Sequence, residues 1–233
     1  MHPTRSSGTV WATLLVGILA IVGAAPGTPP RPVVYPLRAM GTSVNVTLVT
    51  ADSAASFADA SAAHARIRLV DSLMSNWTET SEVARINRVA DSVATAVQPL
   101  VADVIARSLA VWRHSGHTFD ITVEPLVRAW GFIGGPRRVP SEEEARRAFA
   151  LVGAQDVAFD SSSRIIRFRR HGMRIDLGGI AKGYAVDLAM RELRDRGVHN
   201  ALVDASGNMM SVGHPKSSPH WRIGLRDPRD SVP

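Results

Sequence analysis

The sequence predicts an α+β domain in which amphipathic helices are mixed with antiparallel strands. Apolar residues recur at helical spacing in four segments, and short alternating runs are joined by turn-forming residues. The composition agrees, because 45% of the 233 residues are hydrophobic and 21% are charged, as in ordinary folded proteins. The chain has no internal repeat, so one domain is expected over most of its length.

The first 25 residues have the pattern of an export signal or an N-terminal anchor. Arg5 supplies a positive charge, residues 10–22 are almost uninterruptedly apolar, and small residues at 22–24 suit cleavage. The apolar run is short for a membrane-spanning helix, so a cleaved signal is favoured and an uncleaved anchor is the alternative. Residues 26–37 are rich in proline and are interpreted as a linker, which leaves 38–233 as the domain. We therefore expect an exported protein that is periplasmic or lies on the outer face of the cytoplasmic membrane.

Charge and cysteine content exclude several classes of function. The formal charge is +6, but the basic residues are scattered, apart from short clusters such as residues 164–174. No zinc-finger spacing or aromatic RNP-like strand accompanies them, which argues against nucleic-acid binding and leaves an anionic small ligand or a membrane surface as partner. The absence of cysteine excludes disulfides, thiolate metal sites and cysteine nucleophiles.

Each element is predicted from a local signal. A strand follows residues 40–42, because Val44, Val46 and Leu48 alternate with polar residues. A helix capped by Asp52 or Ser53 is expected to residue 74, and a second helix begins at Pro99 and ends before Gly116. The remaining predictions are a helix opened by a capping box at 141–144 and stopped at 153, a hairpin of 157–159 with 165–168, a strand at 173–177, a helix at 180–196, and strands at 201–204, 209–212 and 221–225.

The segment from residue 174 to 187 is the strongest candidate for a binding site. A strand, a glycine pair and a helix N-terminus follow one another, and such a terminus suits a phosphate. Lys182 is expected in the first helical turn, where an anionic ligand would relieve its clash with the helix dipole, and Asp176 lies at the mouth of the turn. The alternative is a surface lysine beside an aspartate that caps its own turn.

Other candidate residues carry weaker signals. Asp120 and Glu124 suit a paired-carboxylate acid and base, but a turn aspartate and a solvent-facing glutamate are the commoner arrangement. Trp77 either stacks on a flat ring or closes the core, and the core is favoured on this residue alone. His114 and His117 have the spacing of metal ligands without a carboxylate partner, so they are interpreted as surface or core residues.

Together these segments resemble the FAD:protein FMN transferase (ApbE-like) family. The resemblance covers residues from about 38 to 227. It rests on runs that occur in the family's order: AMGT (39–42), MSNW (74–77), SEVARIN (81–87), FDITVEPLV (119–127), WGF (130–132), IDLGGIAKGYAVD (175–187), DASGN (204–208) and WRIGLRDP (221–228).

The resemblance implies a T-fold-like domain that binds FAD as substrate together with Mg²⁺. The implied FAD contacts are Met40, Trp77, Thr118, Phe119, Asp120, Asp176 and Lys182, and the implied Mg²⁺ ligand is the backbone carbonyl of Gly179. It also implies a reaction in which a threonine hydroxyl of a target flavoprotein attacks the FMN phosphorus and AMP leaves. Two alternatives stay open: an extracytoplasmic FAD-binding carrier, and an FAD pyrophosphatase in which water replaces the threonine.

The family pattern continues beyond Pro233. Its catalytic histidine and its main metal-binding side chains are expected there, so no catalytic residue is assigned within this sequence. We therefore expect the domain to be incomplete at its C-terminus and residues 1–233 alone to be inactive or nearly so. Family members anchored through a lipidated cysteine differ from this sequence, which has no cysteine.

Overall fold

The computed structural model describes residues 28–225, 227 and 229, and it confirms the α+β class. The predicted signal or anchor at 1–25 lies outside the described residues. Within them, no helix is both long and apolar enough to cross a membrane. In order, the elements are β1 (Arg31–Ala39), β2 (Thr42–Thr50), α1 (Ser53–Met74), α2 (Glu82–Val89), β3 (Thr95–Ala96), α3 (Pro99–His114), η1 (Ile121–Val123), α4 (Glu124–Ala129), α5 (Glu142–Phe149), η2 (Ala154–Asp156), β4 (Val157–Asp160), β5 (Ile165–Phe168), α6 (Gly178–Asp195), β6 (Ala201–Ala205) and β7 (Asn208–Val212).

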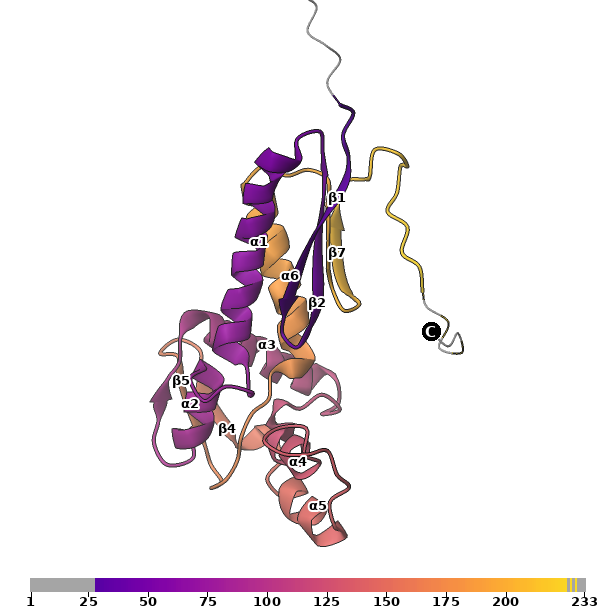
Figure 1. The fold of residues 1–233 in the computed structure, drawn as a ribbon. Coiled ribbons are helices and arrows are strands. Elements are labelled where there is room, and N and C mark those ends of the chain that lie inside the picture. The colour runs from indigo at the N-terminus through magenta and orange to yellow at the C-terminus, as the bar shows by residue number, and fades with distance from the viewer. Residues whose placement is uncertain (1–27, 226, 228, 230–233) are drawn as a thin grey trace, which may run out of the picture.

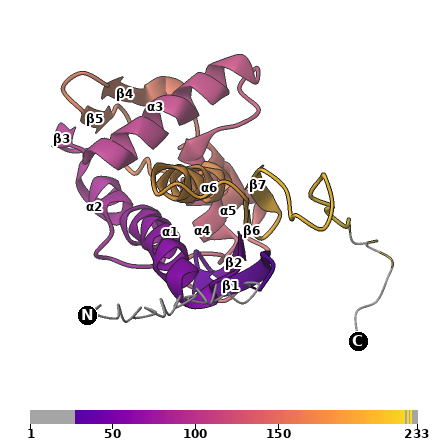
Figure 2. The same cartoon turned by 90° about the horizontal axis from the view of Figure 1, so that it is seen from above.

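A four-stranded antiparallel sheet in the order β1-β2-β6-β7 forms one layer of the fold. The alternating strand residues place Val44, Val46 and Leu48 on its buried face, and Val46 pairs with Val203 of β6. The long helices α1 and α6 pack beside each other and cover this sheet (Figures 1 and 2). The alternation that predicted β2 therefore marks the face that meets the helices.

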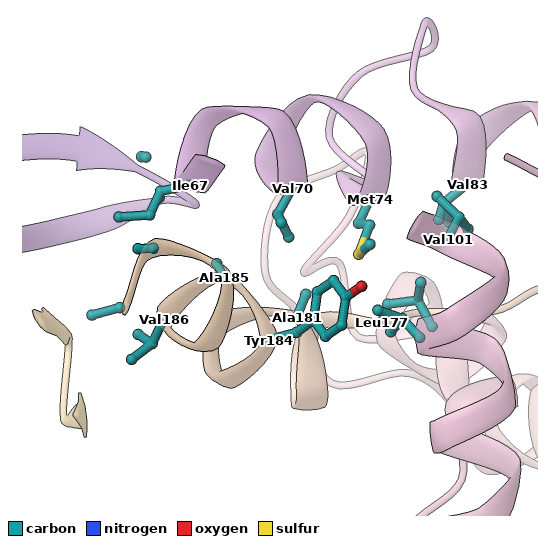
Figure 3. Packing of buried hydrophobic residues seen from close by; sticks show 14 of the residues in the cluster. Ile67, Val70, Met74, Val83, Val101, Leu177, Ala181, Tyr184, Ala185 and Val186 are labelled. Carbon is teal, nitrogen blue, oxygen red and sulfur yellow. The ribbon is translucent and has the colours of Figure 1, made fainter. Parts of the chain in front are cut away.

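Small residues bring α1 and α6 together. Ala60 and Ala63 of α1 and Ala185 and Ala189 of α6 are fully buried. Larger residues fill the space towards the C-terminal end of α1 and the N-terminal end of α6, among them Ile67, Val70, Met74, Leu177 and Tyr184 (Figure 3). Because α1 ends where α6 begins, the packed pair sets two helix termini side by side at one end of the sheet (Figure 1).

A second, three-stranded sheet in the order β3-β5-β4 lies with α2, α4 and α5 beyond that end (Figure 1). The hairpin predicted at 157–168 is present as β4 and β5. The capping box predicted at the start of α5 is also present, with Ser141 and Glu144 bonding each other's backbone N–H groups. Within α5 only Ala148 is buried, and Phe149 is 67% exposed.

The predicted linker at 26–37 is wrong from residue 31 onward, because β1 covers Arg31–Ala39. Pro32 and Pro36 suggested a linker, since proline cannot donate to a sheet ladder. In the described part of the chain β1 pairs with β2 alone and is an edge strand, a position that tolerates both prolines.

Two other predicted strands are absent from the described residues. In residues 173–177, Met173, Ile175 and Leu177 are buried, but the segment forms no ladder with a described strand. Oδ1 of Asn87 accepts the Ile175 N–H, and the Ile121 carbonyl accepts the Asp176 N–H. Residues 221–225 pair with none of the strands that the structure describes, and the indole of Trp221 donates to the carbonyl of Val212. In addition, α6 starts two residues earlier than predicted, so Lys182 lies in its second turn.

Candidate functional site

A pocket of about 720 Å³ opens where α1 ends, α6 begins and the β1–β2 turn folds over them. This volume is typical of small-molecule sites, which span about 300–1,000 Å³. The lining residues come from separate parts of the sequence: Met40, Gly41, Arg68, Val70, Asp71, Ser72, Met74, Ser75, Asn76, Trp77, Thr78, Arg137, Asp176, Gly178, Ala181 and Lys182.

The β1–β2 turn supplies Met40 and Gly41. Both have positive φ, 54° and 70°, as a two-residue type I′ hairpin turn requires. The Met40 N–H donates to Oδ2 of Asp71 on α1 at 2.8 Å. A non-glycine residue in this conformation is unfavourable, and such strained residues often lie at binding sites, so the predicted role of Met40 in FAD binding stays a prediction. Sequence reasoning missed Asp71, which carries no motif signal.

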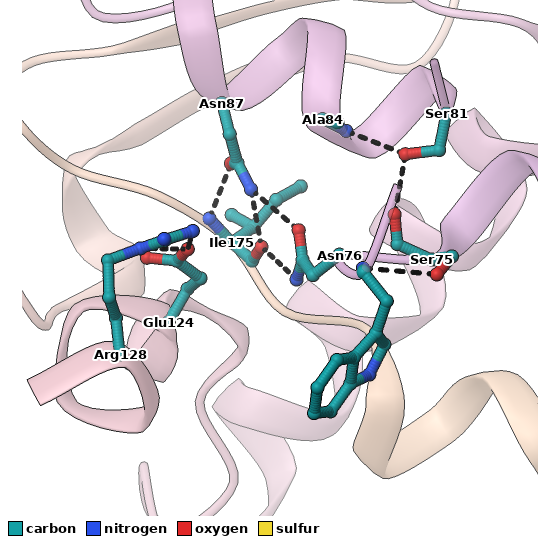
Figure 4. A network of polar contacts seen from close by, with 9 residues as sticks. Ser75, Asn76, Ser81, Ala84, Asn87, Glu124, Arg128 and Ile175 are labelled. Atoms are coloured by element: carbon teal, nitrogen blue, oxygen red, sulfur yellow. Dashed lines mark hydrogen bonds and ion pairs between the residues drawn. The ribbon is translucent and has the colours of Figure 1, made fainter. Parts of the chain in front are cut away.

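The segment after α1 presents Trp77 to solvent. The Trp77 N–H donates to Oγ of Ser75 at 3.1 Å, and Oγ of Ser81 donates to the Ser75 carbonyl at 2.6 Å (Figure 4). The Trp77 side chain is 75% exposed at the pocket rim. The favoured interpretation of Trp77 as a core residue is therefore wrong, and its ring face is open to a planar ligand.

Most of the N–H groups in the first turn of α6 are hydrogen-bonded within the protein. Gly178 N–H donates to Oδ1 of Asp176 at 2.6 Å, while the N–H groups of Ile180 and Ala181 donate to the Leu177 carbonyl at 3.0 and 2.8 Å. Asp176 thus caps its own turn, as the alternative interpretation held, and it also lines the pocket. Gly179 is the first-turn residue for whose N–H the described chain supplies no partner.

Three basic side chains from separate elements line this pocket: Arg68 of α1, Arg137 of the loop before α5, and Lys182 of α6. Among the described residues none of the three forms an ion pair. The lining carboxylates are Asp71, which is held by the Met40 N–H, and Asp176, which is held by Gly178. The pocket therefore has an excess of positive charge available to an anion.

The predicted residues at 118–120 do not line the pocket. Asp120 caps η1, because its Oδ1 accepts from the N–H and hydroxyl of Thr122 at 2.7 and 2.6 Å and its Oδ2 accepts from Ala154 N–H at 2.9 Å. Thr118 Oγ1 donates to the Ser115 carbonyl at 2.9 Å. Phe119 packs on Gly179, where an added Cβ would lie 3.1 Å from its ring. This stretch packs against the start of α6 through Phe119, and its contact with FAD stays a prediction.

Glu124 is fully buried and not solvent-facing, contrary to the sequence interpretation. Its Oε1 accepts from Nε and Nη2 of Arg128 at 3.0 and 2.6 Å, while its Oε2 has no hydrogen-bond partner in the described chain (Figure 4). His114 and His117 are exposed, as expected, and the ring of His117 stacks on Trp112 at 4.0 Å. Neither Glu124 nor the histidines reach the pocket lining.

Comparison with known proteins shows the family of the chain. A sequence model of the ApbE family matches residues 40–233, and the chain belongs to that family. It is 28% identical over 199 residues to an FAD:protein FMN transferase of Klebsiella pneumoniae, a match that covers 83% of this chain and 56% of the relative.

Solved structures give the same result. The Vibrio cholerae flavin transferase ApbE superposes with a TM-score of 0.78 at 26% identity, covering 86% of this chain and 65% of that one. The Thermotoga maritima ApbE protein superposes with a TM-score of 0.78 at 31% identity, covering 87% and 66%. The chain thus spans little more than half the length of its curated Klebsiella relatives.

Proposed function

We propose that the chain binds FAD in this pocket and takes part in moving FMN from FAD to a threonine hydroxyl of a target flavoprotein, with release of AMP. The observation that carries the proposal is a set of three basic side chains beside an exposed indole, none of which pairs with a carboxylate among the described residues. The names of the curated relatives, FAD:protein FMN transferase, support the same substrate.

The chemistry of FAD matches this lining. Its diphosphate is a compact anion that cationic side chains bind through charge-assisted hydrogen bonds, and its isoalloxazine is a flat ring that an indole face can cover. Lys182, Arg68 and Arg137 would hold the diphosphate, and Trp77 would cover a ring at the rim. The Met40 turn, fixed by Asp71, closes the other side.

Transfer would proceed by displacement at the FMN phosphorus. The bond from the threonine oxygen to that phosphorus forms, the bond from the phosphorus to the bridging oxygen breaks, AMP leaves, and the hydroxyl proton is released. Positioning and offset of negative charge dominate catalysis of phosphoryl transfer. The residues of this pocket supply that orientation and charge.

Magnesium dependence is part of the proposal and rests on the family resemblance. The described residues contain no group of three or more histidine, aspartate or glutamate side chains that would hold a metal. Asp176 and the carbonyl of Gly179 are the oxygen donors at the α6 terminus, and Mg²⁺ commonly adds substrate phosphates and water to one or two protein carboxylates. These residues alone make an incomplete site, so no step is derived through the metal.

We also propose an extracytoplasmic location, on the basis of the apolar N-terminal sequence. Expression of the chain with a C-terminal tag, followed by separation of periplasmic, membrane and cytoplasmic fractions, tests this. Tagged protein confined to the cytoplasm would contradict it.

Because residues 1–233 alone are expected to be inactive, the transfer assay combines a full-length version of the protein with FAD, MgCl₂ and a threonine-bearing target peptide. Fluorescent flavin on the peptide with an equal amount of AMP supports the transferase. FAD binding without AMP supports the carrier, and AMP without peptide labelling supports the pyrophosphatase. Trp77→Ala should reduce the signal, whereas Trp130→Ala, which removes a 41% exposed indole outside the pocket, should not.

A further inference from the structure

Asn87 connects two walls of the pocket without lining it. Its side chain is buried in α2, and it reaches residues 88 positions away in the sequence. Its Oδ1 accepts the N–H of Ile175 at 2.8 Å, and its Nδ2 donates to the Ile175 carbonyl at 2.9 Å and to Oδ1 of Asn76 at 3.0 Å (Figure 4). Nδ2 of Asn76 donates to the same Ile175 carbonyl at 3.0 Å, so the three residues form one hydrogen-bond network.

The two residues held by Asn87 precede pocket residues directly. Asn76 is followed by Trp77 at the rim, and Ile175 is followed by Asp176 at the start of α6. Residues 173–177 form no ladder with a described strand, and the side-chain amide of Asn87 makes the two hydrogen bonds to the N–H and carbonyl of Ile175 that a neighbouring strand would otherwise make. A rigid amide with every bond satisfied holds such a segment in one position.

We propose that Asn87 is a positioning residue for the FAD pocket, acting through Asn76 on Trp77 and through Ile175 on Asp176 and the start of α6. The inference rests on the proposed FAD site. It assigns Asn87 a role distinct from any contact with ligand, because Asn87 does not line the pocket and is only 6% exposed.

Asn87→Asp tests this with almost no change in shape. An ionised carboxylate keeps the acceptor for Ile175 N–H but replaces the Nδ2 donor with an oxygen that faces two other oxygens, the Ile175 carbonyl and Oδ1 of Asn76. A flip of the Asn76 amide would relieve one clash and remove the second donor from the Ile175 carbonyl. A protonated carboxyl restores one donor, and burial raises the pKa of such a group, so lowering the pH should rescue the variant.

The measurement is the FAD affinity of the full chain, determined by flavin fluorescence at about pH 8 and about pH 5. Wild type is measured at the same two pH values, because the charged groups near Asn87 in sequence or space, which are Arg174, Asp176 and the Glu124–Arg128 pair, could make FAD affinity depend on pH by themselves. We expect Asn87→Asp to bind FAD about tenfold more weakly than wild type at the higher pH and within about twofold at the lower. Asn200→Asp is the matched control, because in the described part of the chain the Asn200 side chain forms one hydrogen bond, in which Oδ1 accepts from His214 N–H, and the variant keeps that acceptor.

Hydrogen exchange supplies a readout that needs no ligand. In Asn87→Asp at the higher pH, amides of residues 74–78 and 175–182 should lose protection together, while those of residues 57–66 in α1 keep theirs. If the amides of only one of these two segments lose protection, or if neither does, the inference is wrong. This outcome decides the inference even if wild type does not bind FAD and the proposed function fails. If wild type binds FAD but Asn87→Asp binds equally well at both pH values, the positioning role is wrong and the FAD site stands.

Discussion

The backbone N–H of Met40 donates to Oδ2 of Asp71 at 2.8 Å, which ties the β1–β2 turn to the last turns of α1. Met40 has a φ of 54°, a conformation that costs a non-glycine residue free energy. The carboxylate offsets that cost and holds the turn over the pocket. The hairpin between two strands thereby becomes a wall of the binding site.

Asp71→Ala should destabilise the fold by about 1–2 kcal/mol, because Met40 N–H loses a charge-assisted acceptor in a partly buried place. Asp71→Asn keeps an acceptor oxygen and should cost less. Urea unfolding of both variants measures the difference. Equal stability of wild type and Asp71→Ala would show that the bond does not hold the turn.

Arg137→Gln should weaken FAD binding by about three- to tenfold and make the affinity less dependent on salt, because one cation near the diphosphate is lost. Arg137 lies near Phe132, with its guanidinium 5.3 Å from the ring centroid, and lines the pocket. Arg146→Gln is the control, since Arg146 pairs with Glu142 on the exposed face of α5. Binding that is equally sensitive to salt in both variants would place the anion elsewhere.

Removal of the Arg128 side-chain charge should lower the free energy of unfolding more than removal of the Glu124 charge. Arg128→Met leaves the fully buried carboxylate of Glu124 without a counter-ion and should cost about 3 kcal/mol or more. Glu124→Gln keeps an acceptor for Arg128, whose side chain is 44% exposed and can be hydrated. Thermal or urea unfolding tests the order, and a larger loss in Glu124→Gln would contradict it.

Glu82 should contribute acid-sensitive stability. Hydrogen bonds from Arg85 lower the pKa of the Glu82 carboxyl, against the effect of burial, and Gln98 N–H adds to them. Because the folded pKa lies below the unfolded value, this contribution is complete above the unfolded pKa and is lost as the pH falls through the folded one.

Glu82→Gln should therefore cost about 1–2 kcal/mol near neutral pH and flatten the decline of the free energy of unfolding below about pH 4.5. Glu142→Gln, at a carboxylate that is 83% exposed, should leave the curve near that of wild type. Parallel acid curves for wild type and Glu82→Gln would refute the assignment.

Local signals predicted the elements whose stability is local or strongly periodic. The caps of α1 and α5, the proline that opens α3, and the alternation in β2 each act within a few residues. The failures involve tertiary context. Proline in β1 is tolerated only because that strand is at the edge. The eight-residue α2 was missed although Ser81 caps it and Val83 and Ile86 are buried at helical spacing, because two turns give too few apolar positions to distinguish a period.

The site shows the same division. Asp176 and Lys182 were identifiable because a glycine turn before a helix is a local pattern, and both line the pocket. Asp71 and Asn87 were not, since their partners lie 31 and 88 residues away. Arg68 and Arg137 join the pocket only through folding, and neither carries a motif. Asp120 was identified through the family resemblance, yet its two oxygens hold η1 and Ala154 in this structure.

The central claim is that this pocket binds FAD through its cations, and the two lysines of the chain allow a matched test. FAD titration should be saturable in wild type, about tenfold weaker in Lys182→Gln, and unchanged in Lys216→Gln, because only Lys182 lines the pocket. The absence of saturable binding, or equal affinities for the two lysine variants, would contradict the account.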